Sequence, residues 1–469
     1  MGTSVADALL WHRLQFAFTA VYHYLFPQLT IGLALLIVVL KALHLRRGDE
    51  GSAAAARFWI RVFGINFVVG VVTGIPMEFQ FGTNWARFTQ HAGGVIGQTL
   101  ALEGMFAFFL ESTFLGLLVW GEGKISPRAH FLAALALFAG SWLSGYFIVA
   151  TNAFLQHPVG YTVDSAGGLA LGSFWALLLN PWALLQYAHT LVAAVVTGSF
   201  VMCAVGAYWL LSGVHQPAAR ASVSVGAVAG LAATLLVAFP TGDQQAKMVA
   251  RYQPAALAAM EGRFESGSNA EITLIGQPNV HERQLDNPIR VPGFLSFLAF
   301  GHFSAEVLGL NEFPPRDWPT NIELLYYVFH VMVGLGTIMM ALMALAALQA
   351  WRGRLHHTRP LLWILMLTFP LPYIANGAGW LSTELGRQPW LIYGLLRTAD
   401  GSSVSVHAGD ALFTLIGFAG MYLVIGVTFL FLVAREVSHG PPPAPAPAPA
   451  APAPAPAPGP GPGVIEAHR

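Results

Sequence analysis

Long apolar stretches separated by short polar connections run through most of the chain. Scanning for runs of about 20 apolar residues, the length that crosses the hydrocarbon core of a bilayer, gives nine candidates. They lie near residues 15–42, 57–81, 98–120, 129–153, 184–211, 221–240, 322–350, 361–384 and 409–435. The pattern predicts an all-α integral membrane protein, a bundle of about nine transmembrane helices.

One connection is long, from Thr241 to Asn321, and it is much more polar than its flanks. From Pro441 to Gly463 the chain is almost entirely Pro and Ala, which predicts an extended, disordered tail. The first apolar run lacks a basic leader and a cleavage pattern, so we expect a permanent span. The expected organisation is helices one to six over 1–240, an outward-facing loop over 241–321, helices seven to nine over 322–436 and a cytoplasmic tail over 437–469.

The distribution of basic residues orients the predicted bundle. Connections after spans one, three, five and seven contain Arg46, Arg47, Lys124, Arg128, Arg220, Arg352, Arg354 and Arg359. The short connections on the other side contain only Arg87, Arg387 and Arg397. Because short cytoplasmic loops carry an excess of Lys and Arg, this bias predicts an N-terminus outside and a C-terminus in the cytoplasm.

Composition supports a membrane environment and limits the kinds of metal site that the chain can form. The chain has 469 residues, of which 55% are hydrophobic and 10% are charged, whereas soluble domains carry about 25% charged residues. The zero net charge gives no reason to expect nucleic acid as a partner. Cys203 is the only cysteine, which excludes a disulfide framework and Cys-based zinc or iron–sulfur sites. Metal binding would have to use His, Met and Glu side chains.

Five predicted spans carry an unusual ionisable or metal-competent residue. These residues are His23, Glu103, His189, Met332 and Glu384. At 1.5 Å per residue, all five fall within about 15 Å of the outer surface. Ionisable residues inside a membrane are costly and mark functional sites, so their shared depth predicts a cofactor-binding membrane enzyme.

A thioether and an imidazole together suit a low-spin haem iron, and His189 and Met332 could supply that pair from facing helices. A lone His or Glu, such as His23 or Glu384, could leave a haem with an open position for oxygen. Each residue also has an ordinary alternative. Met332 could fill a packing gap, the histidines could be hydrogen-bonded interior residues, and Glu384 could pair with Arg387 at the interface.

Two carboxylates share the third span. Glu103 and Glu111 are eight residues apart, which in an α-helix is about 80° of rotation and 12 Å of rise. Buried carboxylates can alternate between protonated and ionised forms, so the two residues could each carry a proton in turn along a proton path. Ser144 could extend this path through its hydroxyl. The alternative is that these groups only form hydrogen bonds between helices.

An ordered set of motifs resembles subunit I of cytochrome bd-type quinol oxidases. The motifs are Arg13-Leu14-Gln15-Phe16, Tyr22-His23-Tyr24-Leu25-Phe26, the run from Met77 to Trp85, Leu102-Glu103-Gly104, the run from Phe108 to Phe114, His189-Thr190, Met332, Gly379-Trp380 and the run from Gly386 to Trp390. The resemblance covers the chain to about residue 436.

The resemblance implies haem ligation. His189 and Met332 would be the axial ligands of a low-spin haem b, while His23 and Glu384 would serve two high-spin haems. One of these would be haem b and the other haem d, or a further haem b as in a cyanide-insensitive branch. Trp380 and Arg387 would line the haem cluster, and Arg13, Gln388 and Trp390 would bind cofactor with them.

The resemblance also implies routes for protons and quinol. Glu103 would lie beside the oxygen-reducing haem, and Glu111 would lie on the proton route from the cytoplasm. The long loop resembles a quinol-binding loop in which Glu261 matches the acidic residue. Without the resemblance, Glu261 would be interpreted as an ordinary carboxylate exposed to solvent.

Three positions depart from the pattern of the family. Ala256 stands where a Lys is frequent, five residues before the loop Glu. His330 stands where many members have Arg, two residues before the ligand Met, and Asn376 where some carry Glu. The loop is also of the short type. We therefore expect quinol contacts that differ from those of other members.

The expected function is that of the haem-containing subunit of a respiratory terminal oxidase. It would oxidise ubiquinol or menaquinol, reduce O2 to water and generate proton motive force by vectorial, electrogenic chemistry without pumping. The expected setting is the bacterial plasma membrane and its lipid, with a second membrane subunit and a single-helix small subunit. The alternatives are a haem-free transporter and a haem b electron-transfer cytochrome that does not reduce O2.

Overall fold

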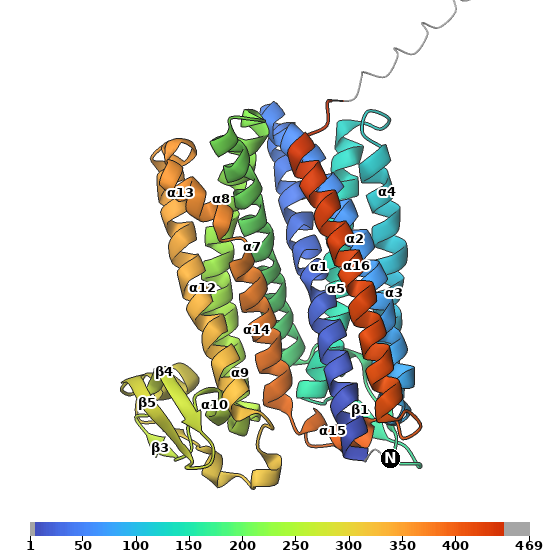
Figure 1. The fold of residues 1–469 in the computed structure, drawn as a ribbon, viewed down its shortest axis with the longest axis vertical. Helices are drawn as coiled ribbons and strands as arrows, with labels where there is room; N and C mark the ends of the chain where they lie inside the picture. Colours follow the sequence, from blue (N-terminus) through green and yellow to red (C-terminus); the bar gives the residue numbers. More distant parts are fainter. Residues whose placement is uncertain (1–4, 445–469) are drawn as a thin grey trace, which may run out of the picture.

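The structure is a computed structural model that describes residues 5–444, apart from the side chains of residues 5–7 and 107. Most of the predicted Pro/Ala-rich tail lies outside these residues. Nine helical spans within the described part are long and apolar enough to cross a membrane, which confirms the predicted all-α bundle (Figure 1).

Six of the spans are single helices and three are built from consecutive segments. The single helices are α1 (Val5–Arg47), α2 (Glu50–Thr83), α5 (Pro127–Gln156), α7 (Pro181–Ser212), α12 (Ile322–Trp351) and α16 (Ala408–His439). The third span consists of α3 (Ala86–Met105), the π-helix η1 (Phe106–Glu111) and α4 (Ser112–Trp120). The sixth consists of α8 (Gln216–Leu236), the π-helix η2 (Val237–Gly242) and α9 (Asp243–Tyr252), and the eighth of α13 (Arg359–Leu367) and α14 (Pro370–Arg387).

The connections contain short elements that the apolar pattern does not predict. Four two-stranded antiparallel sheets pair β1 (Tyr161–Val163) with β2 (Leu169–Leu171), β3 (Gly267–Ser268) with β6 (Glu306–Val307), β4 (Ile272–Asn279) with β5 (Gln284–Val291), and β7 (Trp390–Ile392) with β8 (Leu396–Arg397). The short α-helices are α6 (Phe174–Leu178), α10 (Pro254–Met260), α11 (Phe294–Phe300) and α15 (Thr398–Gly401), and three 3-10 turns, η3 (Leu310–Glu312), η4 (Pro315–Asp317) and η5 (Leu355–His357), complete the order.

The two ends of the bundle differ. In Figure 1 the N-terminal end of α1 and the β4–β5 hairpin lie at the lower end, whereas the α1–α2 turn and the end of α16 lie at the upper end. The long loop and the N-terminus therefore share one end, as the predicted topology requires. The assignment of that end to the outside of the cell stays a prediction from the charge bias.

Two helix boundaries differ from the apolar pattern. The first helix begins at Val5, ten residues before the predicted span, so His23 lies 18 residues into α1. The end of this helix is therefore no measure of the depth of His23 in the membrane. The sixth span continues through α9 to Tyr252, so the first part of the predicted loop is helical. The sixth span continues through Pro240 and Gly242, which lie in the π-helix η2, where the hydrogen-bond pattern of the helix changes.

Small residues let the central helices approach closely. A Cβ on Gly198 of α7 would lie 3.0 Å from the carbonyl carbon of Gly32 on α1. A Cβ on Gly226 of α8 would lie 2.7 Å from the Sγ of Cys203 on α7. Lipid tails are as apolar as Leu, so helices associate in a membrane through such packing rather than through the hydrophobic effect.

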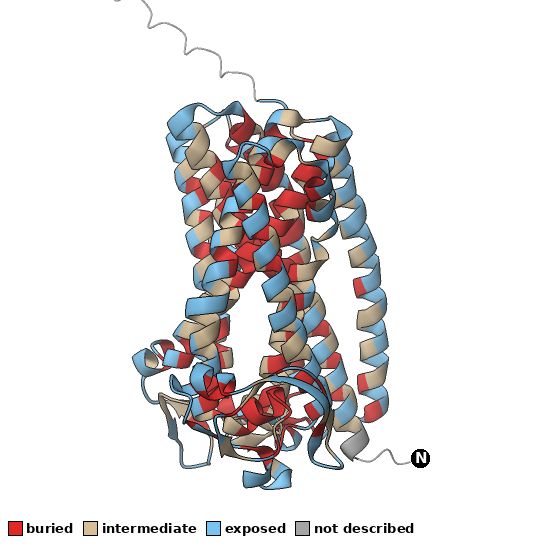
Figure 2. Ribbon diagram, turned by 90° about the vertical axis from the view of Figure 1, so that its left-hand side faces the viewer, coloured by how far each residue is buried: buried red, intermediate tan, exposed pale blue. Residues whose placement is uncertain are grey.

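Buried residues gather in the upper half of the bundle and again in the loop layer, as Figure 2 shows. Large aromatic side chains fill the upper half, among them Trp59 and Trp209, which are fully buried. Their indole N–H groups donate to Ser222 Oγ at 3.0 Å and to the Val437 carbonyl at 2.9 Å. This half forms a solid core that fixes the helices whose lower halves carry the candidate site.

Replacing Gly32 by Ala tests the packing of α1 against α7. The new Cβ would lie 2.9 Å from the Ala194 carbonyl carbon, so the helices must separate, at a cost of about 1–3 kcal/mol. We expect a lower apparent Tm in detergent. Gly417→Ala is the matched control, since its Cβ meets no atom within 4 Å. Equal Tm values for the two variants would show that this approach does not hold the bundle together.

Candidate functional site

His23 is held in one orientation by a threonine of the neighbouring helix. Its Nδ1 lies 3.1 Å from Thr73 Oγ1, and that hydroxyl donates to the Val69 carbonyl at 2.9 Å. A hydroxyl that donates its proton to a carbonyl accepts from the ring, so this network assigns the proton of His23 to Nδ1. The Nε2 lone pair is left free, as in metal-ligating histidines oriented by a second hydrogen bond.

His189 has the same arrangement on α7. Its Nδ1 lies 3.3 Å from Thr241 Oγ1, which donates to the Leu236 carbonyl at 3.0 Å. Thr241 belongs to the π-helix η2, a kind of segment that occurs frequently at functional sites. In the part of the chain that the structure describes, the Nε2 of His189 has no hydrogen-bond partner either.

Three candidate ligands face a glycine of a neighbouring helix or segment. A Cβ on Gly74 would lie 3.0 Å from His23 Cε1, and a Cβ on Gly242 would lie 3.4 Å from His189 Cε1. A Cβ on Gly379 would lie 2.9 Å from the Sδ of Met332. A Cβ at Gly74 or Gly379 would press on the candidate ligand, whereas one at Gly242 would only touch His189. His23, His189, Met332 and Glu384 are all only half-buried, although they lie on helices of a packed bundle.

The ligand-bearing helices meet through α14. This helix packs against both α7, which carries His189, and α12, which carries Met332. Trp380 of α14 also contacts Tyr24 of α1, with ring centroids 5.7 Å apart in an edge-to-face arrangement. The structure thus brings Trp380 next to the residue that follows His23. No hydrogen bond joins His189 to Met332 in the described part of the chain.

Glu384 and Arg387 form an ion pair at the end of α14, which is the pairing that the sequence analysis gives as the alternative to ligation by Glu384. Asn152 of α5 donates to Glu384 Oε1 at 2.7 Å, and Gln186 of α7 donates to Asn152 Oδ1 at 2.9 Å. Arg387 is buried, and within residues 5–444 its Nε has no hydrogen-bond partner. A buried guanidinium with a free N–H fits an anionic group such as a carboxylate of a cofactor.

Glu103 and Glu111 both face α5. The Ser144 hydroxyl donates to Glu103 Oε1 at 3.4 Å, and Glu111 Cγ lies 3.8 Å from a Cβ placed on Gly140. The expected rotation of about 80° between the carboxylates is wrong because η1 separates them. A π-helical turn holds one extra residue, so their spacing is equivalent to seven α-helical residues and about 20° of rotation. The two carboxylates therefore line up along one face.

Polar groups on α5 continue this line. The hydroxyl oxygens of Thr151 and Thr99 lie 2.6 Å apart, and the next residue, Asn152, binds Glu384. Together with Ser141 and Ser144 they give α5 one polar face that runs from Glu111 to Glu384. Sequence reasoning missed Thr99, Thr151, Asn152 and Gln186. The spacing of 141, 144, 151 and 152 places these positions on one helical face, and that could have been read from the sequence.

The loop carboxylate Glu261 is buried, so its reading as a solvated charge is wrong. Its Oε2 accepts the Thr273 N–H at 3.2 Å, and the Thr273 hydroxyl donates to the Glu261 carbonyl at 3.3 Å. Burial raises the pKa of Glu261 to about 7, an effect that the Thr273 N–H and the nearby Arg263 partly oppose. This carboxyl can therefore change its protonation state near neutral pH.

Comparison with known proteins identifies the family. Residues 11–441 match the family of cytochrome bd terminal oxidase subunit I. This chain belongs to that family. It is 36% identical over 444 residues to cytochrome bd ubiquinol oxidase subunit 1 of Bacillus subtilis, covering 92% of this chain and 94% of the relative. It is 30% identical over 502 residues to cytochrome bd-II ubiquinol oxidase subunit 1 of Escherichia coli, covering 93% and 97%.

A solved structure confirms the similarity of fold. The bd oxidase of Geobacillus thermodenitrificans matches with a TM-score of 0.86 and 30% identity, over 93% of this chain and 99% of the other. The nine spans and the family together make the chain a multi-pass membrane protein. Haem and iron follow from membership of the cytochrome bd family.

His330 departs from the family pattern and connects the loop to α12. Its Nε2 lies 3.0 Å from the Thr273 carbonyl in β4, and its Nδ1 lies 2.8 Å from the Tyr326 carbonyl. The ring also packs on Tyr326, with centroids 4.0 Å apart. His330 therefore ties the strand that binds Glu261 to the helix that carries Met332.

Ala256 and Asn376 stand at the other two positions where we expect a departure from the family pattern. Ala256 of α10 is buried, with its Cβ 3.4 Å from a Cβ placed on Gly386 of α14, which leaves no room for a Lys side chain. Asn376 donates to Gln28 Oε1 at 3.0 Å and to Thr197 Oγ1 at 2.9 Å. It joins α14 to α1 and α7 in a small polar cluster.

The other predicted cofactor-binding residues contact the loop layer. Arg13 donates to the hydroxyl of Thr320 at 3.3 Å, and Gln388 accepts from that of Thr398 at 2.8 Å. Trp390 lies under the guanidinium of Arg397, 4.4 Å from its ring centroid. None of these contacts includes a candidate ligand, so their role in cofactor binding stays a prediction.

Glu261→Gln tests the buried loop carboxyl through the pH dependence of stability. Its raised pKa means that the folded chain holds this proton between pH 4.5 and about 7, where the unfolded chain loses it. The unfolding free energy therefore falls across this window, by about 3 kcal/mol at most, and stays low above it. We expect Tm to fall with pH more steeply in the unmodified protein than in the variant.

The control for this measurement is Glu265→Gln, an exposed carboxylate of the same loop. It should leave the pH dependence of Tm unchanged. A Glu261→Gln curve that is parallel to that of the unmodified protein would show that Glu261 does not titrate in this window.

Proposed function

We propose that this chain is the haem-carrying subunit of a quinol oxidase that reduces O2 to water. The observation that carries this proposal is the arrangement of His23, His189 and Met332. Each faces a glycine, and both histidines have Nδ1 on a threonine hydroxyl with Nε2 free. A protein that used these histidines only for packing would have no need to leave both Nε2 atoms free.

His189 and Met332 are proposed as the axial ligands of a low-spin haem b, and His23 and Glu384 as ligands of two high-spin haems. One high-spin haem would be haem b and the other haem d or a further haem b. When bound, these haems would supply electron transfer and oxygen chemistry. Arg387 would offer its free Nε–H to an anionic edge of a cofactor, and Trp380 would pack beside it.

The chain's own residues would control the protons. Glu111 and Glu103 lie on one face toward α5, with Ser141 and Ser144 beside them, and would carry protons from the cytoplasmic end toward the oxygen site. Glu261, whose pKa lies near 7, would accept a proton from quinol at the opposite end. Using opposite faces for release and uptake makes the reaction electrogenic without a pump.

The loop and the helix of Met332 would respond to quinol together. Glu261 and His330 both bind Thr273, one through its N–H and the other through its carbonyl. Tyr326, next to His330, is buried, and in residues 5–444 its hydroxyl has no partner. These groups form a polar site of the kind that holds a quinol hydroxyl, with ubiquinol or menaquinol as substrate.

The proposed setting follows the topology. The end with the N-terminus and the loop over 241–321 would face outward, and the tail would lie in the cytoplasm. A second membrane subunit would pair with this chain, and a single-helix small subunit would join them. The plasma membrane of a bacterium would provide quinol and lipid.

Met332→Leu tests the function directly. Leu keeps the volume and removes the sulfur, so the low-spin haem b signal should be lost from the reduced-minus-oxidised absorption spectrum of the complex. Quinol-driven O2 consumption should fall at least about tenfold, because the low-spin haem would then accept electrons from quinol poorly. Met339→Leu, a buried methionine seven residues along the same helix, is the control and should change neither.

Four outcomes separate the alternatives and identify the haems. A folded complex without haem would support a transporter and overturn the proposal. Haem without quinol-driven O2 consumption would indicate an electron-transfer cytochrome. Red-shifted chlorin bands would identify haem d, and haem b bands alone with full activity would place a further haem b at the oxygen site.

Glu111→Gln tests the proton route. The amide cannot pass a proton, so steady-state O2 consumption should fall at least about tenfold, whereas reduction of the haems by quinol without O2 should keep its extent. Glu436→Gln is the control, a carboxylate near Arg61 at the end of α16. Unchanged turnover in Glu111→Gln would remove this residue from the route.

A further inference from the structure

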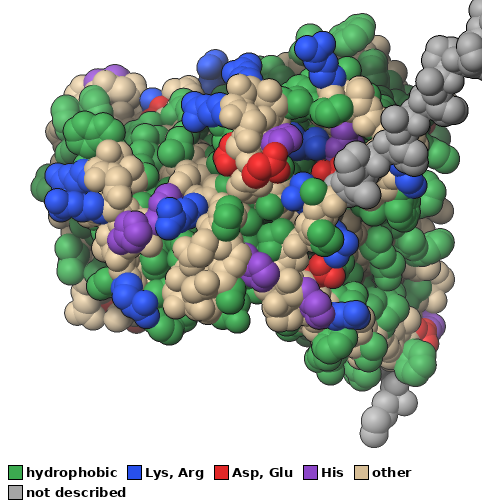
Figure 3. Space-filling view, turned by 90° about the horizontal axis from the view of Figure 1, so that it is seen from above, with side chains coloured by type: hydrophobic (Ala, Val, Ile, Leu, Met, Phe, Trp, Pro, Cys, Tyr) green, Lys and Arg blue, Asp and Glu red, His purple; other side chains and the backbone are tan. Residues whose placement is uncertain are grey.

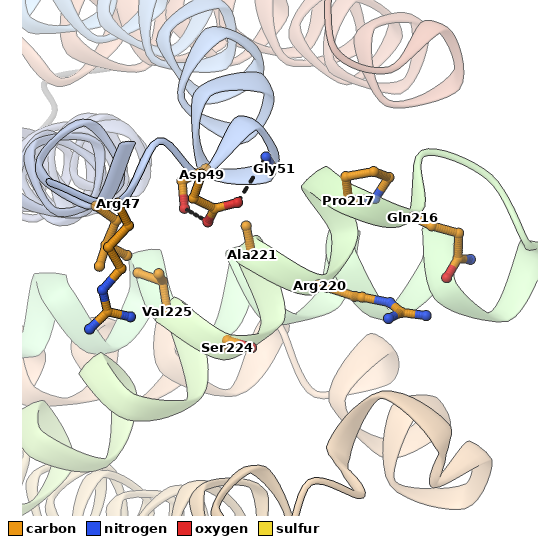
Figure 4. Close-up of a pocket in the computed structure, with 11 residues that line it drawn as sticks. Arg47, Asp49, Gly51, Gln216, Pro217, Arg220, Ala221, Ser224 and Val225 are labelled. Atoms are coloured by element: carbon orange, nitrogen blue, oxygen red, sulfur yellow. Dashed lines mark hydrogen bonds between the residues drawn. The ribbon is translucent and has the colours of Figure 1, made fainter. Parts of the chain in front are cut away.

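The two ends of the bundle present different surfaces. Figure 3 shows the end opposite the loop over 241–321, where Lys, Arg and His side chains lie across the face. Figure 4 shows a pocket at this end, between the end of α1 and the first turns of α8, in which Arg47 and Arg220 point away from each other. Separate basic side chains suit an anionic membrane surface but define no single ligand site. The end with the loop is distinguished by α11, a short helix with an apolar outer face.

The sequence of α11 is apolar on the side that the protein leaves uncovered. Four large side chains of this helix are 39–44% exposed: Phe294, Phe297, Leu298 and Phe300. The only polar residue of the helix, Ser296, is buried. A helix at a surface that meets water has the reverse arrangement, with its polar residues outside. The pattern therefore indicates that the outer face of α11 meets an apolar medium.

The exposed side chains form a continuous patch. Phe303, which follows the helix and is 50% exposed, stacks on Phe297 with ring centroids 5.0 Å apart. The ring of Phe294 contacts both of them, with centroids 6.4 Å from Phe303 and 6.5 Å from Phe297. Contiguous exposed apolar surface of this kind marks a site of interaction with a membrane or with another molecule.

The position of α11 favours the membrane. The helix packs against α9, which continues the sixth span beyond the predicted apolar stretch that ends at Pro240. Because α9 has ten residues, it is about 15 Å long, so α11 lies within about 15 Å of that stretch. This distance places α11 in or beside the lipid headgroup layer. In Figure 1 the β4–β5 hairpin, which leads into α11, lies beyond the edge of the bundle, beside α9 and α12.

The neighbouring helix adds a basic residue suited to the headgroup layer. Arg251 of α9 is exposed, and its guanidinium lies 5.3 Å from the ring centroid of Tyr252. Within residues 5–444 it takes part in no ion pair. Exposed aromatic side chains close to a basic residue are typical of segments that lie in the membrane interface.

Hydrogen bonds join α11 to the segment that binds Glu261. The Leu295 N–H donates to the Ala270 carbonyl at 3.0 Å, and the Ala270 N–H donates to Ser296 Oγ at 2.8 Å. Ala270 precedes Thr273 by three residues, and the Thr273 N–H binds Glu261. The position of α11 therefore sets the distance between Glu261 and the lipid.

We propose that α11 anchors the loop over 241–321 in the lipid headgroup layer at its end of the bundle. The rings of Phe294, Phe297 and Phe300 insert between the lipids, and Arg251 contacts their phosphates. The anchor holds Glu261 close to the surface from which a lipid-soluble quinol reaches the loop, a consequence that rests on the proposed function. The contact with lipid does not depend on that function.

A spin label on Phe300→Cys tests this contact in the complete complex, reconstituted in vesicles of phosphatidylglycerol and phosphatidylcholine. O2 concentrates in lipid and a neutral nickel chelate stays in water, so the collision rates of the label with each reagent report its surroundings. The control is a label on His281→Cys, an exposed position at the tip of the β4–β5 hairpin. We expect the label at 300 to lose most of the collisions with the nickel chelate that the control label has. Cys203 is buried, and the complex without an added cysteine gives the background.

Leu298→Cys gives a second position on the same face. Its label should show the same loss, even where the Phe300→Cys complex does not accumulate. Labels at 298 and 300 that collide with the nickel chelate as frequently as the label at 281 would place this face in water and overturn the proposal. Labels shielded from both O2 and the chelate would identify a protein partner and would also overturn it. These measurements do not use oxidase activity, so their outcome is separate from that of the Met332→Leu test.

Discussion

A polar side chain inside a membrane has no water to bind, so its partner must be a carbonyl of its own helix, a group on another helix or a ligand. This constraint organises the lower half of the bundle. α5 supplies the partners of two carboxylates, through Ser144 to Glu103 and through Asn152 to Glu384. Among the groups without a hydrogen-bond partner in residues 5–444 are the Nε2 atoms of His23 and His189 and the Nε of Arg387. These free groups are where a cofactor can be bound.

Glycines provide the space that this arrangement needs. Where glycines face backbone, as between α1 and α7, they bring helices together and make the upper half rigid. Where they face His23, His189 and Met332, they leave these side chains only half-buried. The same residue type thus serves two purposes in one bundle. The closely packed half fixes the helices, and the other half keeps room beside the candidate ligands.

The apolar pattern was enough to predict the nine spans, because a bilayer sets the length of every helix that crosses it. The ordered sequence motifs were enough to predict the family, which the comparison with known proteins confirms. The pattern could not predict η1 and η2, since a π-helical turn changes the angle between side chains without changing hydropathy. Nor could it predict that Glu261 is buried, because that burial requires the β4–β5 hairpin to fold back so that Thr273 binds Glu261, and hydropathy does not report such a contact.

The departures from the family pattern are consistent with one another. Because Ala256 packs against Gly386, α10 lies close to the end of α14, near Arg387. A Lys at this position would push α10 away and open the site around Glu261. His330, in turn, reaches the Thr273 carbonyl with a ring that is shorter than an Arg side chain. Together these two contacts hold the loop against the bundle. Glu261 is buried in this loop, and its burial raises its pKa to about 7.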